Sequence, residues 1–108
     1  MATRQLISSG SPFEPRIGFS RAVRVGPYVA VSGTAPIAPD GGVAAPGDVY
    51  GQTQRCFEII EQAIKGAGLT DISRWEEAAR AHGEIFVEVK GLINKGWLVE
   101  IEADCIDG

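Results

Sequence analysis

Apolar residues recur at steps of three and four positions between residues 49 and 67, which predicts an amphipathic helix. Asp48 stands where a side chain caps a first turn, and Gly66 and Gly68 form a stop signal at the other end. This helix is the strongest periodic pattern of the chain. Its apolar stripe consists of Cys56, Phe57, Ile60, Ala63, Ile64 and Ala67.

Residues 19–25 and 28–32 carry β-branched side chains in partial alternation, which predicts two strands. The Gly26-Pro27 pair between them is a turn signal, so we expect a hairpin. Residues 33–48 are rich in glycine and proline, which is typical of a loop. A short edge strand is expected inside that loop, near Ile37 or Val43.

The second half of the chain predicts one more helix and two more strands. Ser73 and Glu76 have the spacing of a capping box and predict a helix over residues 73–86. Residues 87–90 alternate like a strand, and residues 97–106 predict a closing strand. The expected fold is therefore a single two-layer α+β domain, a mainly antiparallel sheet packed by two helices.

Composition excludes several classes of function. The net charge of the 108 residues is −4 and the pI about 4.9, which disfavours binding to nucleic acid. We find no apolar run long enough to span a membrane and no secretory signal, so a cytoplasmic protein is expected. Cys56 and Cys105 lack metal-ligand spacing, and a single histidine, His82, cannot build a metal site. We therefore expect reduced thiols, no metal and no cofactor.

Several other residues favour a structural interpretation over a chemical one. Arg24 could bind a carboxylate, but an arginine on a strand surface is the simpler interpretation. His82 is expected to pack within its helix, and Trp75 and Trp97 to anchor a core or an interface. Ser32 has no histidine nearby in sequence, which disfavours a serine nucleophile.

The closing strand presents three carboxylates on one face, because Glu100, Glu102 and Asp104 alternate with apolar residues. The residues alone favour a solvated strand face for all three. Glu88 and Lys90 on the neighbouring predicted strand could pair with them across the sheet.

The stretches VGPYVAVSGTAPIAPDG and VEVKGL…WLVEIEADCI resemble the opening and closing signatures of the Rid family, also called YjgF, UK114-like or endoribonuclease L-PSP-like. The segments VYGQTQRCFEIIEQAIKGAGL and DISRWEEAARAHGEIF resemble its two long helices. The most specific feature is an S-G-x-x-P turn (Ser32, Gly33, Pro36) paired with a late E-I-E strand. The resemblance implies a chorismate-mutase-like α+β fold and a homotrimer with ligand clefts between its subunits.

Many members of that family hydrolyse reactive imines and enamines of small 2-oxo acids to the 2-oxo acid and ammonia. The resemblance gives Glu100, the first glutamate of E-I-E, the role of placing the attacking water. It implies that Ser32, Gly33 and Thr34 line the same cleft. Phe19 matches an aromatic residue that closes over the ligand, where a tyrosine is usual. The implied ligand is a small carboxylated imine or a 2-oxo acid.

The sequence departs from the family pattern at two places within the expected single domain of residues 1–108. A strand is missing near residues 70–72, and a proline-containing loop is missing near residues 84–87. That loop carries an arginine that binds the substrate carboxylate, and Glu84 occupies its place here. Either the protein has further residues at these two junctions, which we favour, or it is a shortened variant.

Two functions follow from these departures. The first is an imine or enamine deaminase that uses Glu100. The alternative is a non-catalytic trimeric module that binds or senses 2-oxo acids, since some family branches lack both the arginine and the activity. RNA cleavage, a label that the family often carries, is disfavoured by the net charge of −4.

Overall fold

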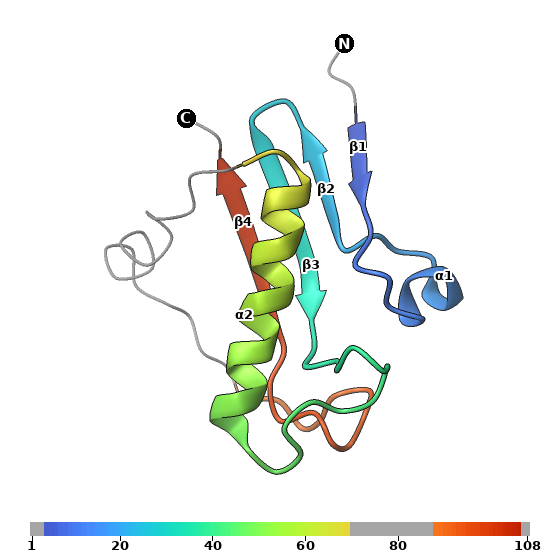
Figure 1. Ribbon diagram of the computed structural model, residues 1–108, viewed down its shortest axis with the longest axis vertical. Helices are drawn as coiled ribbons and strands as arrows, with labels where there is room; N and C mark the ends of the chain where they lie inside the picture. Colours follow the sequence, from blue (N-terminus) through green and yellow to red (C-terminus); the bar gives the residue numbers. More distant parts are fainter. Residues whose placement is uncertain (1–3, 70–87, 107–108) are drawn as a thin grey trace.

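A computed structural model describes residues 4–69 and 88–106 (Figure 1). Four strands form one antiparallel sheet in the order β1-β2-β3-β4, and one long helix lies across a face of that sheet (Figure 1). The predicted two-layer α+β architecture is therefore confirmed. The elements are β1 (Arg4–Ile7), α1 (Phe13–Ile17), β2 (Ala22–Val25), β3 (Tyr28–Thr34), α2 (Val49–Gly66) and β4 (Ile101–Ile106).

Helix α2 packs its apolar stripe on the sheet, as the periodicity predicts. Phe57 is the exception, because it is exposed on the outer side of the helix. Burial of these side chains is the main stabilising term available to so small a domain. The core between the two layers contains Ile7, Ala22, Val29, Val31, Ile60, Ala63, Ile64 and Ala67, and Leu69, Ile101, Ala103 and Cys105 pack against it.

Helix α2 ends in the hydrogen-bonded motif that the glycine signal predicts. Gly68 takes a left-handed conformation with φ of 93°, and its N–H donates to Lys65 O at 2.9 Å. The N–H of Leu69 reaches back to Ile64 O at 3.2 Å, which completes a Schellman cap. The apolar side chain of Leu69 is thereby folded back onto the core.

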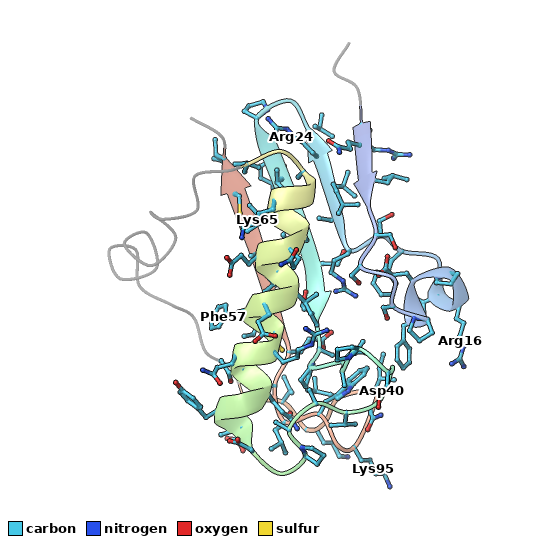
Figure 2. The ribbon with its side chains drawn as sticks, viewed as in Figure 1. Arg16, Arg24, Asp40, Phe57, Lys65 and Lys95 are labelled. Carbon is cyan, nitrogen blue, oxygen red and sulfur yellow. The ribbon has the colours of Figure 1, made fainter. Side chains whose placement is uncertain are left out.

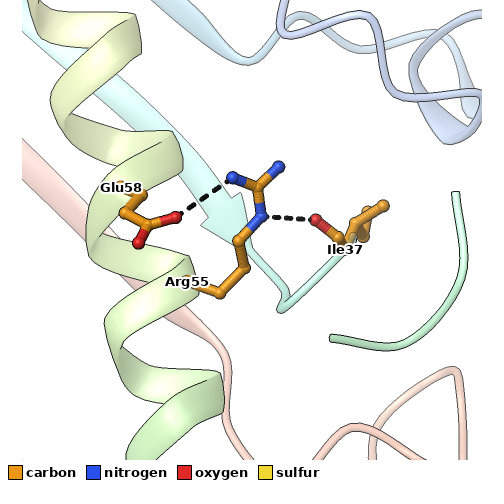
Figure 3. A network of polar contacts seen from close by, with 3 residues as sticks. All are labelled: Ile37, Arg55 and Glu58. Atoms are coloured by element: carbon orange, nitrogen blue, oxygen red, sulfur yellow. Dashed lines mark hydrogen bonds and ion pairs between the residues drawn. The ribbon is translucent and has the colours of Figure 1, made fainter. Parts of the chain in front are cut away.

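The predicted start of α2 is right in position but not in mechanism. Asp48 is the N-cap residue with extended backbone angles, yet its side chain makes no capping hydrogen bond. The short pairing expected in the loop is present as an isolated antiparallel bridge between Ile37 and Val43. Arg55 on α2 supports this loop, because its Nε donates to Ile37 O at 2.7 Å while its Nη1 contacts Glu58 (Figure 3).

Two strand predictions in the second half are wrong. Residues 88–90 are exposed and lie outside any strand, so the proposed pairing of Glu88 and Lys90 across the sheet does not form there. Strand β4 begins at Ile101, whereas residues 97–100 approach the sheet without pairing. The helix predicted over residues 73–86 lies outside the described residues. Strand β1 and the five-residue helix α1 carry too little periodicity to be predicted.

A second, smaller core lies below the sheet, where the loop after β3 meets the segment before β4. It contains Ala35, Ile37 and Trp97, and the Trp97 ring contacts the edge of Phe13 with ring centroids 5.5 Å apart. The prediction that Trp97 anchors a core is confirmed. This core forms one wall of the candidate site described below.

Gln52 clamps helix α2 to the segment that leads into β4. Its side chain is fully buried, its Nε2 donates to Gly96 O at 2.9 Å, and its Oε1 accepts from the N–H of Leu98 at 2.8 Å. The amide therefore satisfies both a carbonyl and an N–H of a segment that has no strand partner. Such groups are costly to bury unpaired.

We expect Gln52→Leu to lower the free energy of unfolding by about 2–4 kcal/mol, because it leaves two backbone groups without partners. Urea unfolding followed by circular dichroism measures this change. The control is Gln54→Leu, since Gln54 is exposed on the same helix and its side chain bonds to Tyr50 at the surface. Equal stability losses in the two variants would contradict the clamp.

Candidate functional site

A cavity of about 320 Å³ lies where α1, the end of β3 and the approach to β4 meet. Its walls are mostly apolar, with a few polar groups among them, which is the usual character of a small-molecule site. Its lining residues are Phe13, Ile17, Phe19, Arg21, Ser32, Gly33, Ala35, Ile37, Ile93, Trp97 and Glu100.

A β-bulge shapes the floor of this cavity. Val31 pairs with Ala103 and Thr34 pairs with Ile101, so β3 has one more residue than β4 between the two pairs. The extra residue belongs to the Ser32-Gly33 turn. Bulges of this kind bend a strand and re-aim its groups, and they are frequent beside active sites.

Gly33 lets the Glu100 carboxylate lie directly against the bulge. A Cβ added to Gly33 would stand 2.8 Å from Oε1 of Glu100, which is closer than real Cβ contacts. Glycine is therefore required here by the close approach of the carboxylate. Glu100 stays solvent-exposed in the single chain, so the cavity is open on its side.

Arg21 is a charged residue of the cavity that the sequence analysis did not assign to the site. It is 2% exposed, and its Nη1 donates to Gly33 O at 2.7 Å and to Thr34 Oγ1 at 3.1 Å. Its Nε donates to Ser9 Oγ at 3.4 Å, and the Phe19 ring lies 5.2 Å from its Cζ. These contacts tie the bulge to the chain before β2.

Two carboxylates act on the buried Arg21. Burial lowers the pKa of Arg21, while the charges of Glu14 and then Glu100 raise it. Glu14 is connected to Arg21 through Ser9, whose hydroxyl donates to Glu14 Oε2 at 2.5 Å. The guanidinium is therefore stabilised by through-space attraction and by a shared hydroxyl.

Glu14 is held as an anion by its hydrogen bonds. Its Oε2 accepts from the N–H groups of Ser9 at 3.1 Å and Ser11 at 3.2 Å, in addition to the Ser9 hydroxyl. Burial would raise the pKa of the Glu14 carboxyl, but these bonds, together with one from Ser8, hold it below its usual value.

The structure brings four of the five predicted site residues together, because Phe19, Ser32, Gly33 and Glu100 all line the one cavity. Thr34 does not line it. Its side chain is fully buried, and its Oγ1 donates to Ser32 O at 2.8 Å, so it supports the bulge from behind. The chemical roles of all five stay predictions.

The other candidates lie away from this cavity. Glu102 and Asp104 are exposed on the outer face of the sheet, where Asp104 accepts a bond from Tyr28 at 2.9 Å. Arg24 is half-buried at the far end of α2, where its Nη1 donates to Ala67 O at 2.6 Å (Figure 2). The strand-face prediction thus holds for two of the three carboxylates of the closing strand.

Both cysteines are free thiols. Cys56 is fully buried on α2, and burial, with a smaller effect from Glu100, raises the pKa of its thiol to about 11. Burial also raises the pKa of Cys105, which is half-buried. Thiols with raised pKa values are poor nucleophiles, in agreement with the prediction of inert cysteines.

Within residues 4–69 and 88–106 no group of three His, Cys, Asp or Glu side chains is placed to hold a metal ion. Among the same residues no helix has the length and apolar character to cross a membrane. His82 and Trp75, which were weighed from the sequence, lie outside the described residues.

The chain belongs to the Endoribonuclease L-PSP family, whose model matches residues 10–74, more than half of the sequence. It is 32% identical to an uncharacterised protein of Streptomyces coelicolor, SCO2049, over 94% of this chain and 91% of that protein. A RutC family protein of Pyrococcus abyssi is 28% identical over 95% of this chain and 96% of that protein.

Solved structures agree with this assignment. Rv2704 of Mycobacterium tuberculosis, a member of the YjgF/YER057c/UK114 family, superposes with a TM-score of 0.72 at 41% identity, covering 96% of this chain and 99% of that one. The Rid protein YyfA of Yersinia pestis gives 0.68 at 26% identity, with coverage of 96% and 99%. These neighbours have the chorismate-mutase-like fold, so the predicted family and fold are confirmed.

The match to the Streptomyces protein also bears on the two departures from the family pattern. The alignment runs over 123 positions, whereas 94% of this 108-residue chain is about 102 residues. About 21 positions of the aligned relative therefore have no counterpart here. The relative is longer than this chain inside the matched region.

The lowered pKa of Glu14 predicts an acid-sensitive contribution to stability. The folded chain binds this proton more weakly than the unfolded chain, so the contribution is complete above the ordinary pKa of 4.5 and is lost as pH falls through the lower folded value. We expect Glu14→Gln to flatten the decline in unfolding free energy between about pH 5 and about pH 3. Urea unfolding at a series of pH values measures it.

The matched control is Glu61→Gln, because Glu61 is exposed on α2 and pairs only with Lys65 at the surface. That variant should keep the decline in unfolding free energy that the wild type shows between about pH 5 and about pH 3. A decline that is equally steep in the wild type and in Glu14→Gln would show that the hydrogen bonds of Glu14 do not lower the pKa of its carboxyl.

Proposed function

We propose that the chain hydrolyses reactive imines and enamines of small 2-oxo acids in this cavity, releasing the 2-oxo acid and ammonia. Glu100 positions the attacking water and takes one of its protons. The water oxygen bonds to the imine carbon as the C=N π bond opens, and the proton passes to the nitrogen, which gives a carbinolamine. The proton of its hydroxyl then moves through Glu100 to the nitrogen, the C=O bond forms, the C–N bond breaks and ammonia leaves. A cytoplasmic setting is part of the proposal, in keeping with two free cysteines.

The observation that carries the proposal is the contact between Glu100 and Gly33. The carboxylate lies against a backbone without a side chain and lines the cavity together with Ser32 and Phe19. A carboxylate held within reach of a bound water is the group that general base catalysis needs. Family membership supports the same reaction class.

The size and walls of the cavity support a small substrate. A volume of about 320 Å³ is at the lower end for ligand pockets and leaves room for an acid of a few carbon atoms. Apolar groups from Phe13, Ile37 and Trp97 form its walls, whereas its side at Glu100 is open in the single chain.

We expect Glu100→Gln to lower the rate of imine hydrolysis by about a hundredfold or more, because the amide cannot accept the proton. The assay generates 2-iminopropanoate in place with an amino-acid oxidase and follows the imine by competition with semicarbazide. Glu102→Gln is the matched control, since Glu102 is an exposed glutamate of β4 two positions further along the chain and does not line the cavity. An intact rate in Glu100→Gln would exclude this role.

The second candidate is a non-catalytic binding module for 2-oxo acids. The place where the resemblance predicts a carboxylate-binding arginine holds Glu84 in the sequence, and this observation favours it. Binding of 2-oxobutanoate without imine turnover would identify this function. Hydrolysis that depends on Glu100 would exclude it.

We also propose that the chain forms a homotrimer through the sheet face opposite α2. The register places an apolar set on this face together with the charged residues Arg4 and Asp104, and several of the apolar members are exposed in the single chain. Exposed apolar patches of this kind mark association surfaces. The set comprises Leu6, Val23, Val25, Tyr28, Ala30 and Ile106.

We expect light scattering of the wild type to give about three times the 11.4 kDa chain mass. Val25→Asp should shift the mass to that of one chain, because it places a charge on the apolar face. Val25 is 41% exposed in the single chain, so the variant should still fold. Val49→Asp, at the 56% exposed start of α2, is the control and should leave the trimer intact.

A further inference from the structure

We propose that Arg21 binds the carboxylate of the ligand in this cavity and thereby selects acids over their uncharged analogues. The ligand class rests on the proposed function, but the assignment of the residue rests on the geometry below. Arg21 is a different position from the one where the resemblance predicts a carboxylate-binding arginine.

The first argument is an unused donor. The three hydrogen bonds of the Arg21 guanidinium use Nη1 and Nε, and none of them uses Nη2. In the described part of the chain no fully buried polar side-chain atom lacks a partner, so Nη2 is not fully buried. Arg21 lines this cavity and also a second one beside Ser9, Arg55 and Ile59. Arg21 is 2% exposed, and the hydrogen bonds of Nη1 and Nε hold its guanidinium in place. The direction of the N–H bonds of Nη2 is therefore fixed as well.

The second argument is the position of Arg21 relative to Glu100. Arg21 donates to the carbonyl of Gly33, and the Glu100 carboxylate lies against the Cα of the same residue. A cation and a carboxylate thus converge on one glycine in one cavity. A short ligand with an acid at one end and a C=N carbon next to it can reach both groups at once.

The third argument is charge. Among the described residues that line the cavity, Arg21 is the one cation. A buried guanidinium gains from a direct carboxylate partner, and its planar fork fits a carboxylate better than an ammonium does. Its hydrogen bonds go to neutral oxygens of Gly33, Thr34 and Ser9, so a ligand carboxylate would supply a direct anionic partner.

Phe19 completes the arrangement. Its ring lies 5.2 Å from Cζ of Arg21 and lines the same cavity. The ring and Ser9 hold the guanidinium from two sides, which fixes its plane before a ligand arrives. Preorganisation of this kind raises affinity, because little side-chain freedom is lost on binding.

The test compares two probes, 2-oxobutanoate and its uncharged amide, 2-oxobutanamide, by titration calorimetry. The wild type should prefer the acid by about tenfold to a hundredfold, the range for hydrogen bonds to charged groups. In Arg21→Gln the two probes should bind alike. Lys65→Gln, which removes an exposed cation from α2, should keep the wild-type preference.

Three results would overturn the proposal. The first is a wild type that binds neither probe or does not prefer the acid. The second is an Arg21→Gln variant that keeps both the affinities and the preference of the wild type. The third is an Arg21→Gln variant that binds both probes more weakly by the same factor, so that the preference is unchanged. The last result would indicate that Arg21 only supports the bulge through Gly33 and Thr34. The ratio of the two affinities is therefore the readout, rather than either affinity alone.

If circular dichroism shows that Arg21→Gln does not fold, two further measurements test the assignment of Arg21. Arg21→Lys keeps the charge without the planar fork, and it should retain an intermediate preference for the acid. In the wild type labelled with ¹⁵N-arginine, 2-oxobutanoate should shift the side-chain resonance that Arg21→Lys removes, and the amide should not. No shift with the acid would overturn the assignment.

The two proposals fail separately. Loss of acid preference in Arg21→Gln without any imine turnover would support the role of Arg21 and reject the deaminase. Turnover that requires Glu100, together with an unchanged acid preference in Arg21→Gln, would support the deaminase and reject the role of Arg21.

Discussion

One extra residue in β3, opposite β4, determines how the lower end of this fold is built. The strands pair regularly from Tyr28 to Val31, and pairing resumes only at Thr34. Had the register continued without the bulge, Gly33 would face Ile101 and Thr34 would face Glu100. The bulge instead brings Gly33 under the Glu100 carboxylate and turns the Gly33 carbonyl towards Arg21.

The segments around the cavity owe their positions to buried side chains more than to strand pairing. Gln52 holds residues 96 and 98, Arg55 holds residue 37, and Arg21 holds residues 33 and 34 (Figure 3 shows the Arg55 contacts). In each case a polar side chain satisfies backbone groups of an irregular segment. Burial of such groups is tolerated only when partners are provided, so these three residues make a cavity of loops possible.

Those parts of the fold were predictable whose sequence pattern extends over many consecutive residues or includes a clear turn signal. Helix α2 follows from its periodicity and its glycine stop, and the β2–β3 hairpin from a turn signal between β-branched runs. Residues 87–90 alternate like a strand, but residues 88–90 are exposed and lie outside any strand. So short an alternation does not show whether another strand is available to pair with it. Strand β1 was missed for a related reason, since Ile7 is its one buried residue.

The site was predictable only through resemblance, and only in part. Glu100, Gly33, Ser32 and Phe19 meet at one cavity, although they are separated by up to 81 positions between Phe19 and Glu100. Arg21 escaped notice because its significance depends on Ser9, Gly33 and Thr34, none of which is adjacent in sequence. The one local feature of Arg21 is that it is a charged residue immediately before a strand. Charged residues in such places are common on protein surfaces, so this feature does not indicate that Arg21 is buried.

The pairing of β3 with β4 has a consequence for the nascent chain. Strand β3 ends at Thr34, and its partner begins at Ile101, 67 positions later. At about 5–20 residues per second, a ribosome needs roughly 3–13 seconds to synthesise that interval. During this time β2 and β3 can form their hairpin, while the other edge of β3 has no strand to bind. Apolar edges left open during synthesis are where neighbouring chains associate wrongly.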